Sequence, residues 1–387
     1  MTNTLAPSTA AIASPPLLRT KSFYRPELDV LRFFAFFGVF LFHFTRPTEL
    51  YVQHGVPRII AALGNGIIQG GVFGVDLFFV LSAYLITELL LREKAECGSL
   101  DVRGFYVRRI LRIWPLYFFY IGLALLPIFN RSHAFTWRHA VAFVFLAGNW
   151  SIIAWGWPIS SIAVPLWTVS VEEQFYLAWP PIVGRLSLSG IAWAALAMLV
   201  IANVTRVVMV ALHGGMNSVW CNTLSRLDPI AAGILIALVL RGRIPGYNSL
   251  LRLIMLGCGI VSLALVANFW KIHEPVTLEW IPTLVGFPVV AFSCMLIVLG
   301  VLGMPLRMPR VFVYLGTISY GLYVYQALGN FLSGVVIPVH SGFLQLALRP
   351  IAALAITILL AATSYAFLET PFLKLKQRFA HIQSRPL

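Results

Sequence analysis

Long apolar segments separated by short polar or basic turns dominate the chain and predict a bundle of membrane helices. They lie near residues 28–45, 66–91, 114–129, 166–184, 189–212, 226–240, 250–269, 280–302, 312–336 and 345–370. Most approach the roughly 20 residues that a helix needs to cross a bilayer. The apolar run at 140–147 is too short and predicts a re-entrant or interfacial helix. We expect an all-α integral membrane protein with about ten transmembrane helices plus this short one.

Clusters of lysine and arginine set the expected topology. They fall at residues 92–112, 185, 241–252, 307–310 and 374–385, in alternate turns between the apolar runs. Cytoplasmic loops carry such an excess of basic residues. We expect a multi-pass protein of the cytoplasmic (inner) cell membrane with both termini in the cytoplasm. We expect residues 1–24 to form a flexible cytoplasmic tail without features of a signal peptide, residues 25–373 the transmembrane domain and residues 374–387 a basic cytoplasmic tail.

Composition excludes a soluble domain and gives no support for a nucleic-acid partner. Of 387 residues, 59% are hydrophobic and only 11% are charged. The net charge of +14 sits beside apolar runs, so we assign it to topology and anionic lipid, not to DNA or RNA. The four cysteines have no metal-like spacing, and no metal site is expected.

The segment from Arg25 to His43, RPELDVLRFFAFFGVFLFH, predicts a helix with an arginine near its start and a histidine deep inside. Arg32 and His43 are eleven residues apart. At 100° per residue this spacing places both on one helical face, about 16 Å apart along the axis. Ionisable groups at such depth usually mark a site or a pathway, so this pair is our first functional candidate. Alternatively, Arg32 reaches lipid phosphates and His43 bonds a neighbouring carbonyl.

Asp76 lies in GVFGVDLFFVLSAYLIT, where apolar surroundings demand a partner for a carboxylate. It either serves the site or pairs structurally with an arginine of the first helix or of a loop. Gly70, Gly71 and Gly74 in the same segment predict the close approach of another helix backbone. Ser82 is expected to be a helix-packing hydroxyl.

The segment FYVRRILRIWPLY carries Arg109 and Arg112 three residues apart, on one helical face at the inner membrane surface. Guanidiniums bind phosphates in a bidentate fashion better than lysines do. We expect these two residues, with neighbouring Arg108, to hold either lipid headgroups or the phosphates of a nucleotide-bearing cofactor.

Two adjacent carboxylates, Glu172 and Glu173, stand in the apolar segment PLWTVSVEEQFYLAWP. Glu172 shares its helical face with Tyr176 and Trp179. Such a pair is hard to explain as core, so we predict a functional or site-organising role, chiefly for Glu172.

Three other features have simpler interpretations. Arg226 and Asp228 predict a local ion pair at a helix start, and Glu369 a structural partner beside the basic tail. Tyr320, Tyr323 and Tyr325 predict aromatic residues at the membrane interface.

Seven motifs together resemble one known family. They are RPELDVLRFFAFFGVFLFH, GVDLFFVLSAYLIT, FYVRRILRIWPLY, LWTVSVEEQFYLAWP, SRLDPIAAGILIA, LGTISYGLYVYQ and LETP. In this order and spacing they resemble the membrane acyltransferase-3 family, O-acyltransferases that modify bacterial sugars and sugar-bearing natural products. The resemblance covers nearly all of residues 22–375. It implies a signature site at Arg32 and His43, acyl-coenzyme phosphates at Arg109 and Arg112, and a conserved glutamate at Glu172.

This sequence departs from the family pattern in three respects. Ala83 stands where the family usually has glycine, which should affect only close packing. Gln326 stands where a histidine is frequent, so no second histidine role can be carried over. The extra periplasmic esterase-like domain of some relatives is not expected, so the membrane core or another protein would handle the acceptor.

The resemblance implies an acyltransferase that uses acyl-CoA, with acetyl-CoA the expected donor substrate and no permanently bound cofactor. His43 would act as general base on a hydroxyl of a carbohydrate or glycosylated acceptor, or as a transient acyl carrier. Glu172 or Asp76 would orient the imidazole. The alternative is a proton-coupled transporter or flippase of a sugar-lipid that uses the same buried groups. Membrane lipid and a possible homodimer complete the expected partners, while the acceptor and the acyl group stay open.

Overall fold

Helices are the only regular elements in the described part of the chain, as expected from the sequence. The structure is a computed structural model that describes residues 24–44, 48–130, 133–159, 161–274, 277–337 and 343–379. Residues 1–23 and 380–387 of the two expected tails lie outside the described residues, and the C-terminal helices continue past residue 373, where the second tail was expected to begin.

The longer helices are α1 (Pro26–His43), α3 (Arg58–Gly70), α4 (Gly74–Cys97), α5 (Val102–Ala124), α8 (Leu166–Arg185), α9 (Leu188–Ala211), α11 (Leu227–Leu240), α12 (Ser249–Leu265), α13 (Trp280–Val301), α15 (Ser319–Val336) and α16 (Phe343–Ser364). The shorter ones are α2 (Thr48–Gln53), α6 (Trp137–Val144), α7 (Gly148–Trp155), α10 (Asn217–Trp220), α14 (Arg310–Thr317) and α17 (Thr370–Lys376). Single turns of 3₁₀ or π geometry are η1 (Gly71–Phe73), η2 (Pro127–Phe129), η3 (Leu224–Arg226), η4 (Val266–Trp270), η5 (Tyr365–Glu369) and η6 (Gln377–Phe379).

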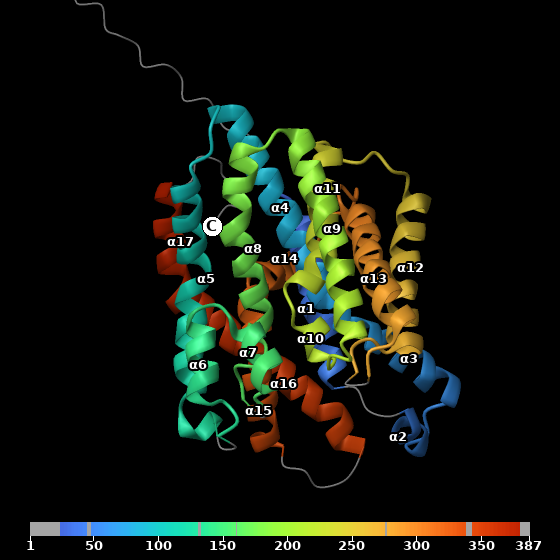
Figure 1. Ribbon diagram of the computed structural model, residues 1–387. Coiled ribbons are helices and arrows are strands. Elements are labelled where there is room, and N and C mark those ends of the chain that lie inside the picture. The colour runs from blue at the N-terminus through green and yellow to red at the C-terminus, as the bar shows by residue number, and fades with distance from the viewer. Residues whose placement is uncertain are drawn as a thin grey trace, which may run out of the picture.

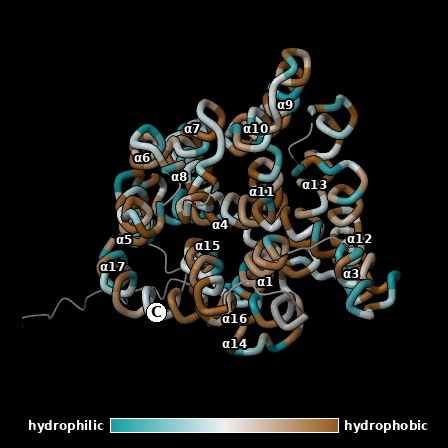
Figure 2. Tube along the Cα trace, turned by 90° about the horizontal axis from the view of Figure 1, so that it is seen from below, coloured by the Kyte–Doolittle hydropathy of each residue, from teal (hydrophilic) through white to brown (hydrophobic). Residues whose placement is uncertain are grey.

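Helix α4 lies near the middle of the bundle, with α1, α8, α11 and α15 around it (Figure 2). Glycines at the start of α4 and just before it allow α1 and α12 to come close to this part of the chain. A methyl group on Gly71 would collide with the backbone of Gly38 in α1, and one on Gly74 with the carbonyl of Ala35. A methyl group on Gly70 would lie 3.0 Å from the backbone nitrogen of Ala264 in α12, which is also a close approach. The predicted close approach at these glycines is confirmed.

One end of the bundle, here called the basic end, gathers the C-termini of α4, α8 and α11 with the N-terminus of α5; it lies at the top of Figure 1. Lys94 caps α8 there, because its ammonium donates to the carbonyls of Val183, Gly184 and Leu186 at 2.9, 3.1 and 2.9 Å. These carbonyls belong to the last turn of α8 or follow it, where no amide within the helix can reach them. Lys94 thus fixes α8 to α4.

The expected count of about ten crossings is not confirmed. Five stretches are long and apolar enough to cross a membrane: Arg58–Cys97, Leu188–Ala211, Ser249–Trp270, Trp280–Val301 and Leu348–Phe379. The bent pair of α14 and α15, with 75° between them, makes a sixth if it is one broken span. Helices α1, α5 and α8 carry charged residues and pack against protein, so an apolar surface is not required of their whole length.

The short apolar run at 140–147 is not a crossing, as predicted. It belongs to α6 and the turn after it, which leads to α7, and each helix has eight residues. Eight residues span about 12 Å, well short of a bilayer. The sequence predicted one short helix, but the backbone turns at Leu146, which has a positive φ of 57°, and a second helix follows.

Candidate active site

A cavity opens among α1, α4, α5, α8 and α15. Val75 and Ile86, eleven residues apart on α4, both line it, so it extends about 16 Å along that helix. The part nearer the basic end is polar and is lined by Arg32, Ser82, Arg109, Arg112, Glu172 and Tyr176. The opposite part, here called the deep end, is lined by Val75, Thr168, Val169 and Tyr323. The cavity therefore has a cationic end and a largely apolar end.

Three arginines from two helices meet in this cavity. Arg32 comes from α1, whereas Arg109 and Arg112 come from α5, and all three also line an adjoining cavity at the basic end. Arg32 lies 3.5 Å from Asp29, a long contact for an ion pair. The structure thus brings together the first-helix arginine and the paired arginines that the sequence singled out.

Aromatic rings, not carboxylates, hold Arg109 in place. Its guanidinium carbon lies 5.2 Å from the ring centre of Tyr176 and 5.4 Å from that of Phe105. Among the described residues, neither Arg109 nor Arg112 forms a hydrogen bond or an ion pair. Stacked guanidiniums keep their N–H groups available for an anionic ligand.

Glu172 is the carboxylate of the cavity, and two hydroxyls hold it. Ser82 donates to Oε1 at 3.0 Å and Tyr176 donates to Oε2 at 3.1 Å. Ser82 is therefore more than the packing hydroxyl that we expected, because it joins α4 to α8 through this bond. The adjacent Glu173 turns elsewhere and accepts a bond from the Trp114 indole at 3.0 Å.

His43 lies apart from the arginines. It is the last residue of α1, its side chain is exposed, and it is not among the residues that line the cavity. Because Gly74 contacts Ala35, the deep end lies near the level of Ala35, eight residues and about 12 Å before His43. Its ring lies near Phe42, which also contacts His273, with ring centres 5.6 and 5.4 Å apart. The role of His43 stays a prediction.

Asp76 is the partner of a buried loop arginine. Its two carboxylate oxygens lie 2.8 and 2.9 Å from Nη2 of Arg226 in η3, and both side chains are almost fully buried. Arg226 also stacks on Trp220, 4.5 Å from its ring centre. The structural alternative for Asp76, pairing with a loop arginine, is the one that the structure adopts.

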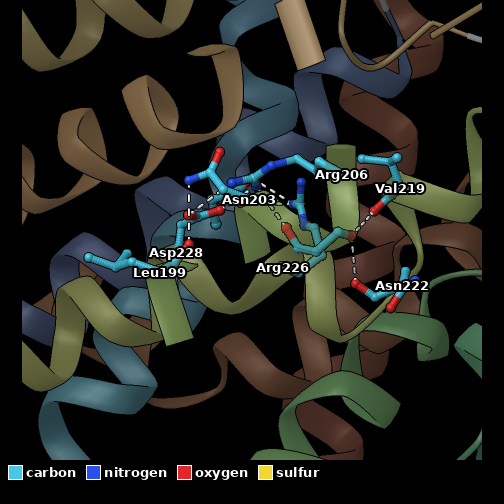
Figure 3. Close-up of polar contacts among 9 residues, drawn as sticks. Leu199, Asn203, Arg206, Val219, Asn222, Arg226 and Asp228 are labelled. Carbon is cyan, nitrogen blue, oxygen red and sulfur yellow. Dashed lines mark hydrogen bonds and ion pairs between the residues drawn. The ribbon is translucent and has the colours of Figure 1, made fainter. Parts of the chain in front are cut away.

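The predicted local pair of Arg226 and Asp228 is wrong. Arg206 of α9 binds the Asp228 carboxylate through both terminal nitrogens and donates to the carbonyl of Ser225 at 2.9 Å (Figure 3). Because Arg226 and Asp228 are only two residues apart at a helix start, their side chains point to different neighbours. Each acid of this centre therefore pairs with a base from another segment.

Arg108 does not share the cavity with its neighbours Arg109 and Arg112. It forms an ion pair with Glu93 at 2.9 Å and donates to the carbonyl of Phe379 at 2.7 Å. It is one residue from Arg109 and so points about 100° away from it. Arg108 therefore links α5 to α4 and η6.

The interpretation of Tyr320 and Tyr323 as interface aromatics is wrong, since both line the cavity. The Tyr320 hydroxyl donates to the carbonyl of Ile113 at 3.1 Å. The Tyr323 hydroxyl lies 3.0 Å from that of Thr168. Their spacing of three residues, which places them on one helical face, was the available signal.

A cavity with these properties suits a ligand with an anionic headgroup and a long uncharged arm. The guanidiniums at one end offer paired donors to phosphates. The apolar wall beyond them suits a flexible chain, and the hydroxyls at the deep end can bind a polar group carried on it. The fold and cavity define a membrane helical bundle with an internal cavity that carries arginines at one end.

The chain belongs to the family described as "Acyltransferase domain", whose sequence profile matches residues 25–369. The match confirms the resemblance seen in the motifs.

Curated relatives named as O-acetyltransferases align with this chain. A Staphylococcus aureus (strain MSSA476) protein named "Putative O-acetyltransferase SAS0844" is 26% identical over 91% of this chain and 58% of its own length. "O-acetyltransferase OatA" of S. aureus (strain NCTC 8325 / PS 47) is 26% identical over 91% and 57%. "Putative peptidoglycan O-acetyltransferase YrhL" of Bacillus subtilis (strain 168) is 32% identical over 56% and 33%. The chain thus spans little more than half the length of these two Staphylococcus aureus relatives. No solved structure matches it.

Proposed function

We propose that this protein is a membrane-bound O-acyltransferase that moves an acyl group, acetyl in the first instance, from acyl-CoA to a carbohydrate hydroxyl. The basic end would face the cytoplasm, because its loops carry the excess of arginine and lysine typical of that side. Peptidoglycan sugars are the first acceptors to test, since one relative is named for them. Family membership favours this function over the alternative of a transporter or flippase.

The proposal rests on two arginines of the cavity that have no partner within the described residues. Arg109 and Arg112 have no hydrogen-bonded or ion-paired partner in the described part of the chain, although both line the cavity and are partly buried. Glu172, the carboxylate that lines the same cavity, accepts hydrogen bonds from Ser82 and Tyr176 instead. Leaving guanidinium donors unsatisfied is costly, so the site is suited to a bound anion. The diphosphate of a coenzyme A thioester fits this requirement.

The other candidate residues would take different roles in acyl transfer. Arg32 would support the phosphates beside Arg109 and Arg112, and the thioester would extend toward the deep end. His43 would act as general base on the acceptor hydroxyl, as an imidazole does near neutral pH. Because His43 lies about 12 Å beyond the deep end, the reaction requires a second state in which the two are connected. Glu172 would tune the charge of the arginine cluster.

The phosphate contacts can be tested with two donors. Acetyl-CoA carries the phosphates, whereas acetylpantetheine has the same thioester without them. Arg109→Ala and Arg112→Ala should each lower kcat/KM for acetyl-CoA by about tenfold or more and leave that for acetylpantetheine little changed, since each removes a charge-assisted bond to phosphate. Arg103→Ala, an exposed arginine at the start of α5, is the matched control. Equal losses with both donors would contradict phosphate binding.

The histidine and the reaction class can be tested together. Purified full chain in nanodiscs, given acetyl-CoA with a radiolabelled acetyl group and soluble peptidoglycan fragments, should release free CoA and label the fragments. His43→Ala should abolish labelling without unfolding the protein, and His54→Ala, an exposed histidine in the loop after α2, serves as control. Full activity of His43→Ala would remove this histidine from the mechanism. A carrier would leave the thioester intact.

A further inference from the structure

We propose that Tyr323 donates a hydrogen bond to the thioester carbonyl of the acyl donor and stabilises the oxyanion that forms there, while Thr168 positions the Tyr323 hydroxyl. The inference rests on the proposed function, because it requires an acyl thioester in the cavity. It assigns a catalytic residue to α15 and a positioning residue to α8.

The location of Tyr323 matches the expected location of the carbonyl. Arg109 and Arg112 occupy the end of the cavity that adjoins the basic end, and Tyr323 lies in the deep end with Val75 and Thr168. In an acyl-CoA the thioester is at the far end of an uncharged arm from the diphosphate. Once the arginines hold the phosphates, that arm can extend only away from them. The reacting carbonyl therefore belongs beside the hydroxyls of the deep end.

Most other hydroxyls of the cavity already have an acceptor. Ser82 and Tyr176 donate to Glu172, and Tyr320 donates to the carbonyl of Ile113. Each of these hydroxyls has one proton, so none is left for a ligand unless the protein bond breaks. This leaves Tyr323 with Thr168, and Ser319, as sources of a donor.

The Thr168–Tyr323 pair has an arrangement of its two protons that leaves the phenol donor free for a ligand. Their oxygens lie 3.0 Å apart, and the Thr168 hydroxyl also lies 3.1 Å from the carbonyl of Pro165. When Thr168 donates to Tyr323, the phenol proton is free to point into the cavity. A carbonyl oxygen that accepts a hydrogen bond from the phenol polarises the phenol O–H. The hydrogen bond from Thr168 to Tyr323 and the one from Tyr323 to the carbonyl then strengthen each other. Thr168 thereby acts on the substrate through Tyr323.

The phenol is held rigidly where it would be needed. The ring of Phe78 meets the Tyr323 ring edge to face, with centres 5.8 Å apart. Tyr323 is 8% exposed and Thr168 5% exposed, so little water competes for the donor. A preorganised donor in a water-poor site stabilises developing negative charge more than a mobile one in solvent does.

The step then balances as an ordinary acyl transfer. The acceptor oxygen attacks the carbonyl carbon and a C–O bond forms, while a base takes the acceptor proton. The carbonyl oxygen becomes an oxyanion that accepts the hydrogen bond from Tyr323, whose proton remains on the phenol. Collapse breaks the C–S bond, and the leaving thiolate takes up the proton held by the base. The products are an ester and free CoA.

Ser319 is the competing donor within the cavity. It also lines the cavity, four residues before Tyr323 on α15 and hence about 6 Å nearer the arginines. A carbonyl bound at that level would leave the arm folded. The two residues are distinguished by separate substitution.

The experiment compares variants that keep each ring or shape. Tyr323→Phe should lower kcat for CoA release from acetyl-CoA, with peptidoglycan fragments present, by about 10²-fold, while KM for acetyl-CoA changes little. Thr168→Val should cause a smaller loss that Thr168→Ser restores. Tyr325→Phe removes a buried hydroxyl from the same helix outside the cavity and should leave kcat unchanged. Thermal unfolding in detergent checks that every variant is folded.

A second measurement detects the hydrogen bond from Tyr323 to the thioester carbonyl. Acetyl-CoA labelled with carbon-13 at the carbonyl should show a lower carbonyl stretching frequency when bound to the wild type or Tyr325→Phe, and the unshifted frequency when bound to Tyr323→Phe. The role of Tyr323 would be overturned if Tyr323→Phe kept the wild-type kcat, or if it showed the same frequency shift as the wild type. A loss of kcat seen only in Ser319→Ala would overturn it too. If the wild type neither binds nor consumes acetyl-CoA, the proposed function fails as well, so the two failures are distinguishable.

Discussion

The buried pair of Asp76 and Arg226 allows a sharp test of what holds this bundle together. Both side chains are 2% exposed or less, and Nη2 of Arg226 serves both carboxylate oxygens at 2.8 and 2.9 Å. In Asp76→Val the guanidinium would remain buried without a counter-ion, and Nε and Nη1 already lack partners among the described residues. Breaking such a pair from one side costs about 3–5 kcal/mol. The unfolding equilibrium should shift by roughly two to four powers of ten.

A double variant separates the free-energy cost of leaving Arg226 unpaired from the net stability that the ion pair contributes. In Asp76→Val/Arg226→Met no charge is left unpaired, and the methionine can pack against Trp220 and Phe287, on which the guanidinium now stacks. Replacement of a buried ion pair by apolar residues is often nearly neutral. We therefore expect the double variant to lie within about 1.5 kcal/mol of the wild type, well above either single variant.

The assay is unfolding by SDS in mixed micelles, followed by tryptophan fluorescence. Glu274→Gln is the matched control, because it breaks an exposed pair with Lys271 whose side chains are 39% and 56% exposed, and it should change stability by less than about 0.5 kcal/mol. The reasoning is refuted if Asp76→Val is as stable as this control, or if the double variant loses the sum of the single losses. CoA release by a folded double variant then decides whether Asp76 serves the reaction, because its structural role has been replaced.

Two further predictions concern packing and capping. Gly71→Ala should destabilise the protein by about 1–3 kcal/mol, because the new methyl group meets the backbone of α1, whereas Gly64→Ala meets nothing and should be neutral; equal SDS midpoints would contradict this. Lys94→Met should cost about 1–3 kcal/mol, because three carbonyls at the end of α8 lose their donor, and hydrogen exchange at that end should quicken. Lys374→Met, at an exposed lysine, is the control, and a similar loss there would refute the capping role.

Several local features of this protein could be predicted from the sequence. The apolar runs identified a helical membrane bundle, because a bilayer fixes the length and polarity of whatever crosses it. The glycines before α4 predicted a close helix contact that Gly38 and Ala35 provide. The arginine spacing on α5 placed Arg109 and Arg112 on one face, and both line the cavity. Each of these predictions depends only on the residues within one segment of the chain.

The tertiary structure decided which groups meet across helices. Asp76 pairs with Arg226, 150 residues away along the chain, while Asp228 turns to Arg206 instead of its close neighbour. Tyr323 lies in a cavity and not at the membrane surface, and His43 lies outside the cavity that Arg32 lines. The helical repeat fixes spacing along one helix, but the rotation of that helix and its neighbours depend on packing contacts between distant segments. The sequence therefore determined the elements and their charged faces, and the packing of the bundle determined the site.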